Sequence, residues 1–303
     1  MSDAETTLLA RALAIAGENP EAVVAVVGAT GSGKTELAIG LADKLGGEII
    51  GCDSVQIYQH FDIGSGKPSA AERARAPHHL IDVLDPSENA DAMAYAALAE
   101  RAVEDIRARG KVPVLCGGTY FWVRALVIGL APAPRADAAI RARHRAITEE
   151  RGRAALHEEL ARVDTASAAR LHPNDVVRVS RALEVHELSG RTMSEHHAEH
   201  GFRAHRMASA MIGISTTPEL LTERIRRRAE AWLANGWIDE VRDLVERGHG
   251  ETRAMGSVGY REVYAHLQGK LAHEALLDAI VQSTRIFTRK QRTWLRTAPI
   301  EWL

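Results

Sequence analysis

Residues 22–47, AVVAVVGATGSGKTELAIGLADKLGG, narrow the possible folds of this chain further than any other segment. Residues 22–28 form an uninterrupted run of small and β-branched apolar side chains that ends in glycine, which is typical of a parallel strand buried on both faces. Residues 34–47 carry apolar side chains at helical spacing and end in two glycines. A buried strand joined to a helix by a glycine-rich loop predicts an α/β fold.

The loop between these two elements has the pattern G-x-x-x-x-G-K-T. Its glycines allow backbone N–H groups to close around phosphate oxygens at a helix N-terminus, where Lys34 adds positive charge. The Thr35 hydroxyl is suited to Mg²⁺, which we expect as the cofactor. The pattern alone leaves open whether the phosphate belongs to a hydrolysed nucleotide, a phosphoryl donor or a diphosphate leaving group. The predicted phosphate-binding loop comprises Gly28, Ala29, Thr30, Gly31, Ser32, Gly33, Lys34 and Thr35.

Strands and helices continue to alternate along the chain, at 47–54, 78–85 and 112–119 for strands and at 90–110 for a helix. Only helical periodicity follows the prolines of residues 131–137, and strand character returns at 208–216. We predict a P-loop NTPase-like parallel sheet flanked by helices. Its core should comprise residues 1–134 and 206–303, with residues 135–205 as an all-helical insertion domain.

The composition indicates a globular cytoplasmic protein. Hydrophobic residues make up 46% of the chain, enough for a large core, and the net charge is −2. The two cysteines, Cys52 and Cys116, are too sparse for a disulfide framework, which favours a reducing compartment. No signal peptide or membrane-spanning run is evident in the sequence, so we expect no membrane partner. We also expect a monomer, although no sequence feature sets the oligomeric state.

Asp53 follows the second predicted strand, at the carboxyl edge of the sheet and beside the phosphate loop. A carboxylate there could take a proton from an acceptor, hold Mg²⁺ through water in an NTPase, or simply cap the next turn. The loop and Asp53 together are therefore compatible with a phosphotransferase, a hydrolase or an enzyme with a diphosphate leaving group.

Seven segments in register resemble the bacterial tRNA dimethylallyltransferases, also called tRNA isopentenyltransferases. The resemblance extends from about residue 22 to the end of the chain, which is far more specific than a phosphate loop. This chain has MGSVGYRE where the commoner family form has arginine before VGYR, which places any base contact at that position in doubt. The matching segments are residues 53–68, 76–86, 113–132, 171–191, 238–248, 255–263 and 283–296.

The resemblance implies that dimethylallyl diphosphate binds the loop and that its prenyl group moves to the N6 amine of the adenosine 3′ of the anticodon in tRNA. Lys34 and the loop would bind the diphosphate, and Asp53 would accept or orient the N6 proton. Thr119 would bond the oxygen that bridges the diphosphate to the prenyl carbon, and Arg228 would reach the diphosphate from the other side. A buried threonine bonded to a carbonyl, and an arginine on a solvated face, are the structural alternatives.

The resemblance also implies contacts with the tRNA anticodon stem-loop. Tyr120, Phe121 and Trp122 could line the prenyl channel, stack on bases or belong to the core, and Asn174 with Asp175 should cap a helix. The residues expected to contact tRNA are Asp53, Ser54, Val55, Gln56, Thr119, Arg141, Val177, Arg178, Val179, Ser180, Arg181, Gly256, Ser257, Val258, Gly259, Tyr260, Arg261, Arg285, Arg289 and Arg292.

The pattern of charge near the C-terminus supports an RNA partner independently. Arg285, Arg289, Arg292 and Arg296 fall at i, i+4, i+7 and i+11, and no acidic residue occurs from 281 to 296. Such a helical stripe is suited to phosphates, whereas a solvated face usually mixes both signs.

Three other functions were weighed. A P-loop kinase of a small acceptor would bind ATP tightly and need no RNA. An RNA-binding protein with a nucleotide switch would form no covalent product. The segment HHAEH, residues 196–200, fits a zinc-protease pattern but lacks a third ligand. We favour the tRNA prenyltransferase.

Overall fold

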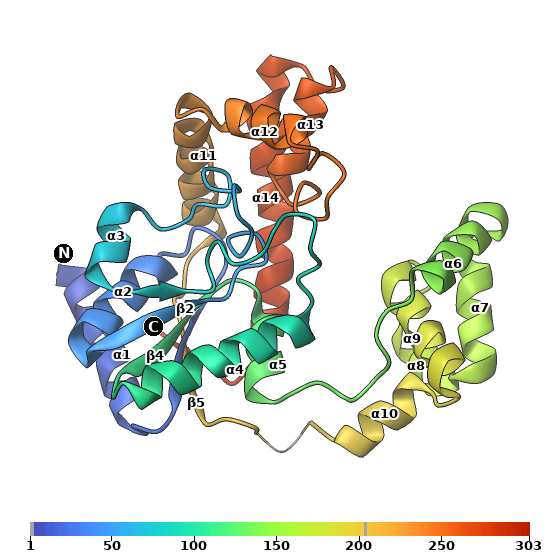
Figure 1. Ribbon diagram of the computed structural model, residues 1–303, viewed down its shortest axis with the longest axis horizontal. Coiled ribbons are helices and arrows are strands. Elements are labelled where there is room, and N and C mark those ends of the chain that lie inside the picture. The colour runs from blue at the N-terminus through green and yellow to red at the C-terminus, as the bar shows by residue number, and fades with distance from the viewer. Residues whose placement is uncertain (1–2, 203–204) are drawn as a thin grey trace. The chain divides into compact units, whose positions relative to one another are not determined.

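A parallel sheet lies at the centre of the larger of two units in the computed structural model, which describes residues 3–202 and 205–303 (Figure 1). Six strands within these residues pair in the order β3-β2-β4-β1-β5-β6, and every pairing is parallel. They are β1 (Val23–Val27), β2 (Gly47–Gly51), β3 (His78–His79), β4 (Val112–Gly117), β5 (Ser209–Gly213) and β6 (Glu301–Trp302). The parallel sheet predicted from the sequence is confirmed.

Two strands differ from the sequence-based expectation. The strand expected at 78–85 contains only two residues, because Leu80 and Asp82 adopt positive φ angles of 59° and 60° that no strand accommodates. Strand β6 was not anticipated. It pairs Ile212 with Glu301, so residues 301–302 extend the sheet by one strand beyond β5.

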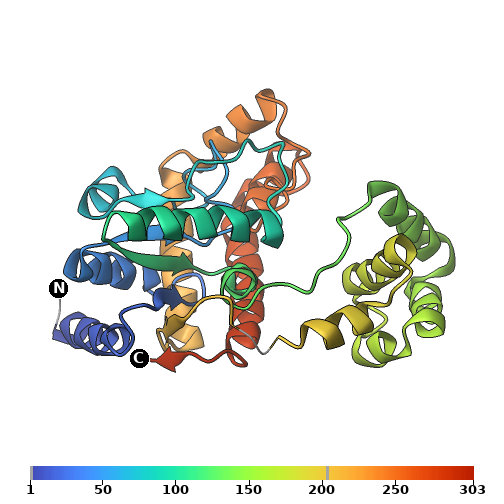
Figure 2. The ribbon, with the colours of Figure 1, turned by 60° about the horizontal axis from the view of Figure 1, so that its bottom comes forward.

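Helices cover both faces of the sheet (Figure 2). Helices α1 (Asp3–Gly17) and α2 (Lys34–Leu45) pack on one face, where Leu9, Leu41 and Ile39 join Val24 and Val26 in one core cluster. Helices α4 (Ala92–Ala108) and α5 (Tyr120–Val127) lie on the other face. All five residues of β1 are buried, as expected for a strand covered on both sides.

The larger unit contains five further helices. It includes α3 (Ala70–Arg75), α11 (Pro218–Ala234), α12 (Trp237–Glu246), α13 (Tyr260–Leu267) and α14 (His273–Leu295). Helices α11 and α14 pack against each other and carry the arginines considered below. No helix among residues 3–202 and 205–303 is both long and apolar enough to cross a membrane.

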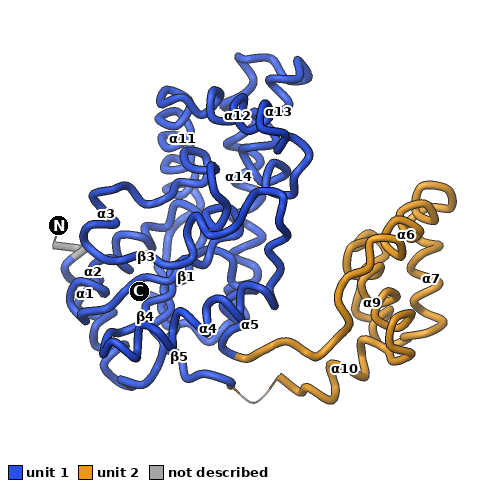
Figure 3. The backbone as a smooth tube through the Cα atoms, in the orientation of Figure 1, with its two compact units in different colours: residues 1–127, 206–303 blue, residues 128–205 orange. Residues whose placement is uncertain are grey.

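The second unit is helical and comprises residues 128–205 (Figure 3). Its helices are α6 (Ala138–Arg151), α7 (Arg153–Val163), α8 (Thr165–Arg170), α9 (Val176–Ser189) and α10 (Met193–His200). Asp175 caps α9 by accepting a bond from the Arg178 N–H, as predicted. The unit begins at residue 128 rather than 135, because the proline-rich segment bonds to it: Arg181 donates to the Pro134 carbonyl at 2.6 Å.

A buried ion pair in β2 gives the larger unit a defined acid sensitivity. The carboxylate of Glu48, 5% exposed, bonds to the Arg109 guanidinium and lies 2.7 Å from His79 Nε2. Arg109 is the principal cause that lowers the Glu48 pKa from 4.5 to about 2. A carboxylate whose pKa is lower in the folded than in the unfolded chain stabilises the fold at pH values above its unfolded-state pKa, here 4.5. This stabilisation is lost as the pH falls from 4.5 toward 2.

We therefore expect Glu48→Gln to remove a pH-dependent stabilisation of about 3 kcal/mol. Urea unfolding between pH 2 and 7 measures it. The native chain should lose stability below about pH 4.5, while the variant should show a shallower loss. Glu230→Gln, at an exposed position, is the control and should behave like the native chain. Equal pH slopes for Glu48→Gln and the native chain would contradict the assignment.

Candidate active site

The phosphate loop connects β1 to α2 and has the backbone geometry that its glycines predict. Gly31 and Gly33 have φ angles of 87° and 94°, a region that L side chains rarely adopt. A Cβ atom on Gly28 would lie 2.6 Å from the Ser32 hydroxyl oxygen. Gly33 precedes α2 and offers no side-chain cap, so the first N–H groups of the helix remain available to an anion.

Lys34, the first residue of α2, lies partly buried in this loop. Its Nζ donates to the Ala29 carbonyl at 3.4 Å. Burial is the main cause that lowers the Lys34 pKa, the charge of Asp53 acts to raise it, and the charge of Arg228 acts to lower it. The three charged groups therefore lie within electrostatic range of one another, although they come from three separate segments.

Asp53 is held in place by the backbone of the turn that follows β2. Its Oδ1 accepts bonds from the N–H groups of Val55, at 2.9 Å, and Gln56, at 3.3 Å. Its second oxygen, Oδ2, receives no hydrogen bond from any residue that the structure describes. One oxygen fixes the side chain while the other is available to a substrate proton.

Thr119 lies next to Asp53 because β2 and β4 are neighbours. The Thr119 Oγ1 accepts a bond from the Ser54 N–H at 3.2 Å, and the Thr119 N–H donates to the Cys52 carbonyl at the same distance. Gly117 makes this approach possible, since a Cβ there would lie 1.9 Å from the Cys52 oxygen. The Thr119 hydroxyl hydrogen is left to donate elsewhere.

Both cysteines lie beside these groups and are free thiols. Burial raises the pKa of Cys52 to about 12 and that of Cys116 to about 11. They are therefore neutral at physiological pH and add no charge to the site.

Two arginines of α11 face the phosphate loop. The Arg228 guanidinium stacks 4.5 Å above the Trp232 ring. Burial lowers the pKa of Arg228, whereas the charge of Asp53 acts to raise it. Arg224 donates to the carbonyls of Gly31 at 3.3 Å and Ser32 at 3.4 Å. Arg227 instead pairs with the exposed Glu223 at 2.7 Å.

Gln291 of α14 links the phosphate loop to the segment that carries Thr119. No signal in the sequence marks this residue. Its Oε1 accepts a bond from the Thr30 N–H in the phosphate loop, and its Nε2 donates to the Gly118 carbonyl beside Thr119, both at 3.0 Å. The side chain is 8% exposed. A buried amide that satisfies one group in each segment fixes the spacing between them.

We expect Gln291→Met to weaken binding of inorganic diphosphate by about tenfold or more, because the Thr30 N–H and the Gly118 carbonyl lose their partners. Thr293→Val, on the exposed side of the same helix, is the matched control. Equilibrium binding of the diphosphate measures both. Equal affinities in the two variants would show that Gln291 does not position the loop.

In the helical unit, the predicted tRNA contacts fall into two groups. Val177, 81% exposed, and Arg178 lie on the surface of α9. Val179 was also expected to contact RNA, but its side chain is fully buried in the core of the unit and offers RNA no accessible surface. The guanidiniums of Arg141, at 2.9 Å, and Arg181, at 2.6 Å, bond to the buried carboxylate of Glu184. Ser180 bonds to His144 inside the same unit, at 2.9 Å.

In the larger unit, Ser54, Gly256 and Arg261 are exposed, whereas Val55, Gln56, Ser257 and Val258 are half-buried. The side chain of Tyr260 is fully buried, so it offers RNA no accessible surface in this structure, and its contact with tRNA stays a prediction. Its hydroxyl donates to Glu240 at 2.7 Å, and the same carboxylate accepts from the Ile63 N–H at 2.6 Å. Gly259 is buried against Trp237, where a Cβ would lie 2.4 Å from the ring.

The three arginines of α14 and Arg296, which follows its last residue, are exposed, and no hydrogen bond or ion pair within the described chain occupies their side chains. Other arginines of the region are paired, as Arg226 is with Asp278 at 2.6 Å. The unpaired stripe is Arg285, Arg289, Arg292 and Arg296.

The aromatic residues of α5 divide between the core and the surface. Trp122 is buried and stacks on Tyr95 with ring centres 4.4 Å apart, and Tyr120 is also buried. Phe121 is 45% exposed and its ring centre lies 6.3 Å from that of Trp294. Of the three, Phe121 alone has a surface position from which it could stack on a base.

The HHAEH segment lies at the end of the helical unit. His196 is buried, with its Nε2 3.4 Å from the Ser189 hydroxyl, and His200 packs on Phe202 with ring centres 4.4 Å apart. Within residues 3–202 and 205–303, no group of three or more His, Cys, Asp or Glu side chains is placed to hold a metal ion.

Comparison with known proteins identifies the family. The family model described as IPP transferase matches residues 56–298, well over half of the chain, and the isopentenyl transferase model matches residues 21–85. This chain belongs to the IPP transferase family. The resemblance seen in the sequence is confirmed.

Curated relatives of this chain are named tRNA dimethylallyltransferase. That of Sorangium cellulosum is 58% identical over 95% of the chain and 92% of the relative, and that of Geobacter sulfurreducens is 42% identical over 93% and 91%. The solved structure of the tRNA isopentenylpyrophosphate transferase of Bacillus halodurans has a TM-score of 0.69 at 35% identity, covering 93% and 89%. A eukaryotic dimethylallyltransferase acting on tRNA has a TM-score of 0.74 at 27% identity, covering 93% and 73%.

Proposed function

We propose that this protein transfers the dimethylallyl group from dimethylallyl diphosphate to the N6 amine of the adenosine 3′ of the anticodon in tRNA. The observation that carries the proposal is the convergence of Lys34, Asp53 and Arg228 on the phosphate loop. Two cations and the loop suit a diphosphate, and a carboxylate with one free oxygen suits the proton of an amine. The names of the relatives supply the substrates.

On the diphosphate side, the barrier arises mainly from negative charge that grows as the allylic C–O bond breaks. Fixed donors that oppose this charge supply most of the rate in such sites. The N–H groups at the start of α2, Lys34 and Arg228 are positioned to do so. The Thr119 hydroxyl, whose oxygen already accepts from the Ser54 N–H, would donate its hydrogen to the bridging oxygen.

On the acceptor side, the N6 lone pair is delocalised into the purine ring and the amine must lose a proton as it attacks. The N–C bond forms, the C–O bond breaks, the electron pair of that bond leaves with the diphosphate, and the proton passes to Asp53 Oδ2. The two backbone bonds to Oδ1 hold Asp53 in the orientation for this step. General base catalysis of this kind contributes about 10²- to 10⁴-fold.

The site also fits a Mg²⁺ ion. Thr35 in the first turn of α2 supplies one hydroxyl, and Mg²⁺ usually takes few protein ligands and completes its shell with substrate phosphates and water. When bound, the ion would neutralise part of the diphosphate charge. We propose Mg²⁺ as the cofactor, held by Thr35.

We propose the tRNA anticodon stem-loop as the macromolecular partner of a cytoplasmic monomer. The adenosine must leave its stack to reach Asp53, at a cost of a few kcal/mol, and contacts with the RNA backbone must offset that cost. The unpaired Arg285 and Arg289 of α14, and the exposed face of α9 at Val177 and Arg178, are the surfaces that we assign to these contacts.

Salt dependence tests the arginine stripe. Replacing Arg285 and Arg289 by Gln should reduce the slope of log K against log salt concentration by about 1.4 to 1.8, because each lost phosphate contact removes about 0.7 to 0.9. Filter binding of tRNA at several salt concentrations measures it. Arg226→Gln with Arg227→Gln is the matched control, since both arginines already have acidic partners. An unchanged slope would place Arg285 and Arg289 on a solvated face.

One assay tests the proposed function itself. The protein is incubated with unmodified tRNA, labelled dimethylallyl diphosphate and Mg²⁺, without ATP. Label should appear in the tRNA as N6-isopentenyladenosine. A folded protein that transfers no label under these conditions, but phosphorylates a small acceptor from ATP, would support the kinase alternative instead.

A further inference from the structure

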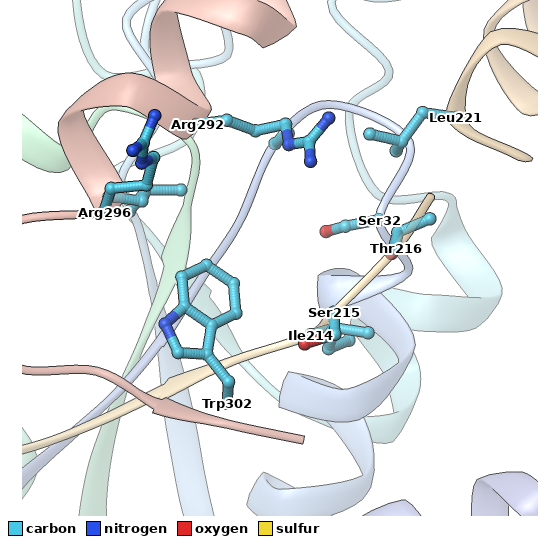
Figure 4. A pocket seen from close by; sticks show the side chains of 10 residues that line it. Ser32, Ile214, Ser215, Thr216, Leu221, Arg292, Arg296 and Trp302 are labelled. Carbon is cyan, nitrogen blue, oxygen red and sulfur yellow. The ribbon is translucent and has the colours of Figure 1, made fainter. Parts of the chain in front are cut away.

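A cavity lies beside the phosphate loop, toward the edge of the sheet that carries β5 and β6 rather than toward Asp53 and Thr119 (Figure 4). Its volume is about 240 Å³. The loop contributes Ala29 and Ser32, and the segment that follows β5 contributes Ser215 and Thr216. Arg292 comes from the last turn of α14 and Arg296 from the residue after the helix. The remaining walls are apolar or aromatic and consist of Ile214, Leu221, Leu295 and Trp302. The transfer chemistry proposed above leaves this cavity without a role.

Two arginines of the α14 stripe line this cavity. Arg292 and Arg296 are one helical turn apart, and Figure 4 shows both side chains beside the open space that Ser32 faces. Neither guanidinium has an acidic partner in the described part of the chain. Two uncompensated positive charges at one small cavity favour a polyvalent anion. Sequence reasoning had assigned Arg292 to the tRNA backbone.

A buried hydroxyl provides independent evidence for a ligand. Ser32 is 3% exposed, and its Oγ has no hydrogen-bond partner among the residues described. Figure 4 shows this oxygen directed into the cavity, toward the space between Arg292 and Trp302. Buried polar atoms without partners are rare because they are costly. A ligand oxygen in the cavity would satisfy the Ser32 hydroxyl.

The size of the cavity decides between possible anions. Pockets that enclose drug-sized ligands usually measure roughly 300 to 1,000 Å³. At about 240 Å³, this cavity suits a small inorganic anion better than a whole nucleotide. Arginine donates in pairs to the oxygens of phosphates, and the apolar walls at Leu221 and Leu295 strengthen such charge-assisted bonds.

We propose that this cavity is a second binding site for inorganic diphosphate, formed by Ser32, Arg292 and Arg296 and adjoining the phosphate loop. Its role rests on the proposed function, because the transfer reaction releases diphosphate in the loop. Diphosphate released from the loop then moves into this neighbouring site. The site lies on the β5 side of the loop, away from Asp53, where the RNA base would bind. The proposal assigns Arg292 and Arg296 to the product and leaves Arg285 and Arg289 to tRNA.

Binding of labelled inorganic diphosphate with Mg²⁺, in the absence of tRNA and dimethylallyl diphosphate, tests the proposal. The native chain should bind two equivalents, and Lys34→Met should retain one of them. Replacing Arg292 and Arg296 by Met should weaken only that retained site, by about tenfold or more. Binding at the phosphate loop in this variant shows that it is folded. Arg296→Glu, at an exposed position after α14, tests the same site by charge reversal and should also weaken it.

A single site in the native chain that Lys34→Met eliminates, or two sites that the arginine variants leave unchanged, would overturn the proposal. Adenosine diphosphate is the second probe. If it binds the retained site at least tenfold more tightly than diphosphate, and Trp302→Ala abolishes the difference, the cavity holds a nucleotide and the proposal is wrong. None of these measurements uses prenyl transfer, so a failure here leaves the proposed function to its own assay.

Discussion

Lys34→Met should lower the rate of prenyl transfer by about 10²- to 10³-fold, or roughly 3 to 4 kcal/mol. Lys34 begins α2 inside the phosphate loop and lies within electrostatic range of both Asp53 and Arg228. Methionine keeps much of the apolar stem but removes the charge that opposes the developing diphosphate. Because that charge grows during C–O cleavage, we expect the loss mainly in the rate of the chemical step rather than in tRNA affinity.

Single-turnover transfer with saturating tRNA measures this effect. Lys44→Met is the matched control, since Lys44 occupies the last turn of the same helix and is exposed. The control should transfer at the native rate. A rate for Lys34→Met within about tenfold of native would mean that the remaining donors, Arg228 and the N–H groups of α2, stabilise the leaving group without Lys34.

The sheet could be predicted because its central strands are short apolar runs buried on both faces, and β1, β2, β4 and β5 each leave that signal in the sequence. Strand β6 could not be predicted, since its two exposed residues at the sheet edge carry no periodicity. The early end of β3 depends on positive φ angles at Leu80 and Asp82, and leucine is a residue type that rarely adopts them.

The site was predictable only where its chemistry is local in sequence. The phosphate loop is one contiguous segment, so its glycines and Lys34 identify it directly. Gln291 bonds to Thr30 across 261 residues, and Arg224 bonds to Gly31 across 193, distances over which a single sequence shows no coupling. These contacts depend on how α11 and α14 pack, which follows from the whole core.

Burial limits how two of the residues expected to contact tRNA could do so. Val179 and Tyr260 lie inside segments that were expected to contact tRNA, but both side chains are fully buried. On a helix, neighbours in sequence point in different directions, so Val177 is exposed while Val179 is not. A segment can approach RNA while alternate residues of it build the core.

Asp53→Asn should lower the transfer rate by about 10²- to 10⁴-fold while leaving tRNA affinity within roughly twofold of native. Asparagine retains an Oδ1 that can accept from the N–H groups of Val55 and Gln56, so the turn after β2 should persist. It lacks the second carboxylate oxygen that is free to take the N6 proton. The change therefore removes the base and preserves the geometry that presents it.

Single-turnover rates and tRNA binding, measured on the same preparation, separate two possible roles of Asp53. One is to accept the N6 proton, and the other is to bind the purine in the ground state. Asp239→Asn is the control, because that carboxylate is exposed on α12 and pairs only with its exposed neighbour Arg242. If Asp53→Asn lost RNA affinity in proportion to rate, Asp53 would bind the purine in the ground state rather than accept its proton. A rate loss confined to the chemical step identifies Asp53 as the group that activates N6, since the backbone bonds to its other oxygen remain.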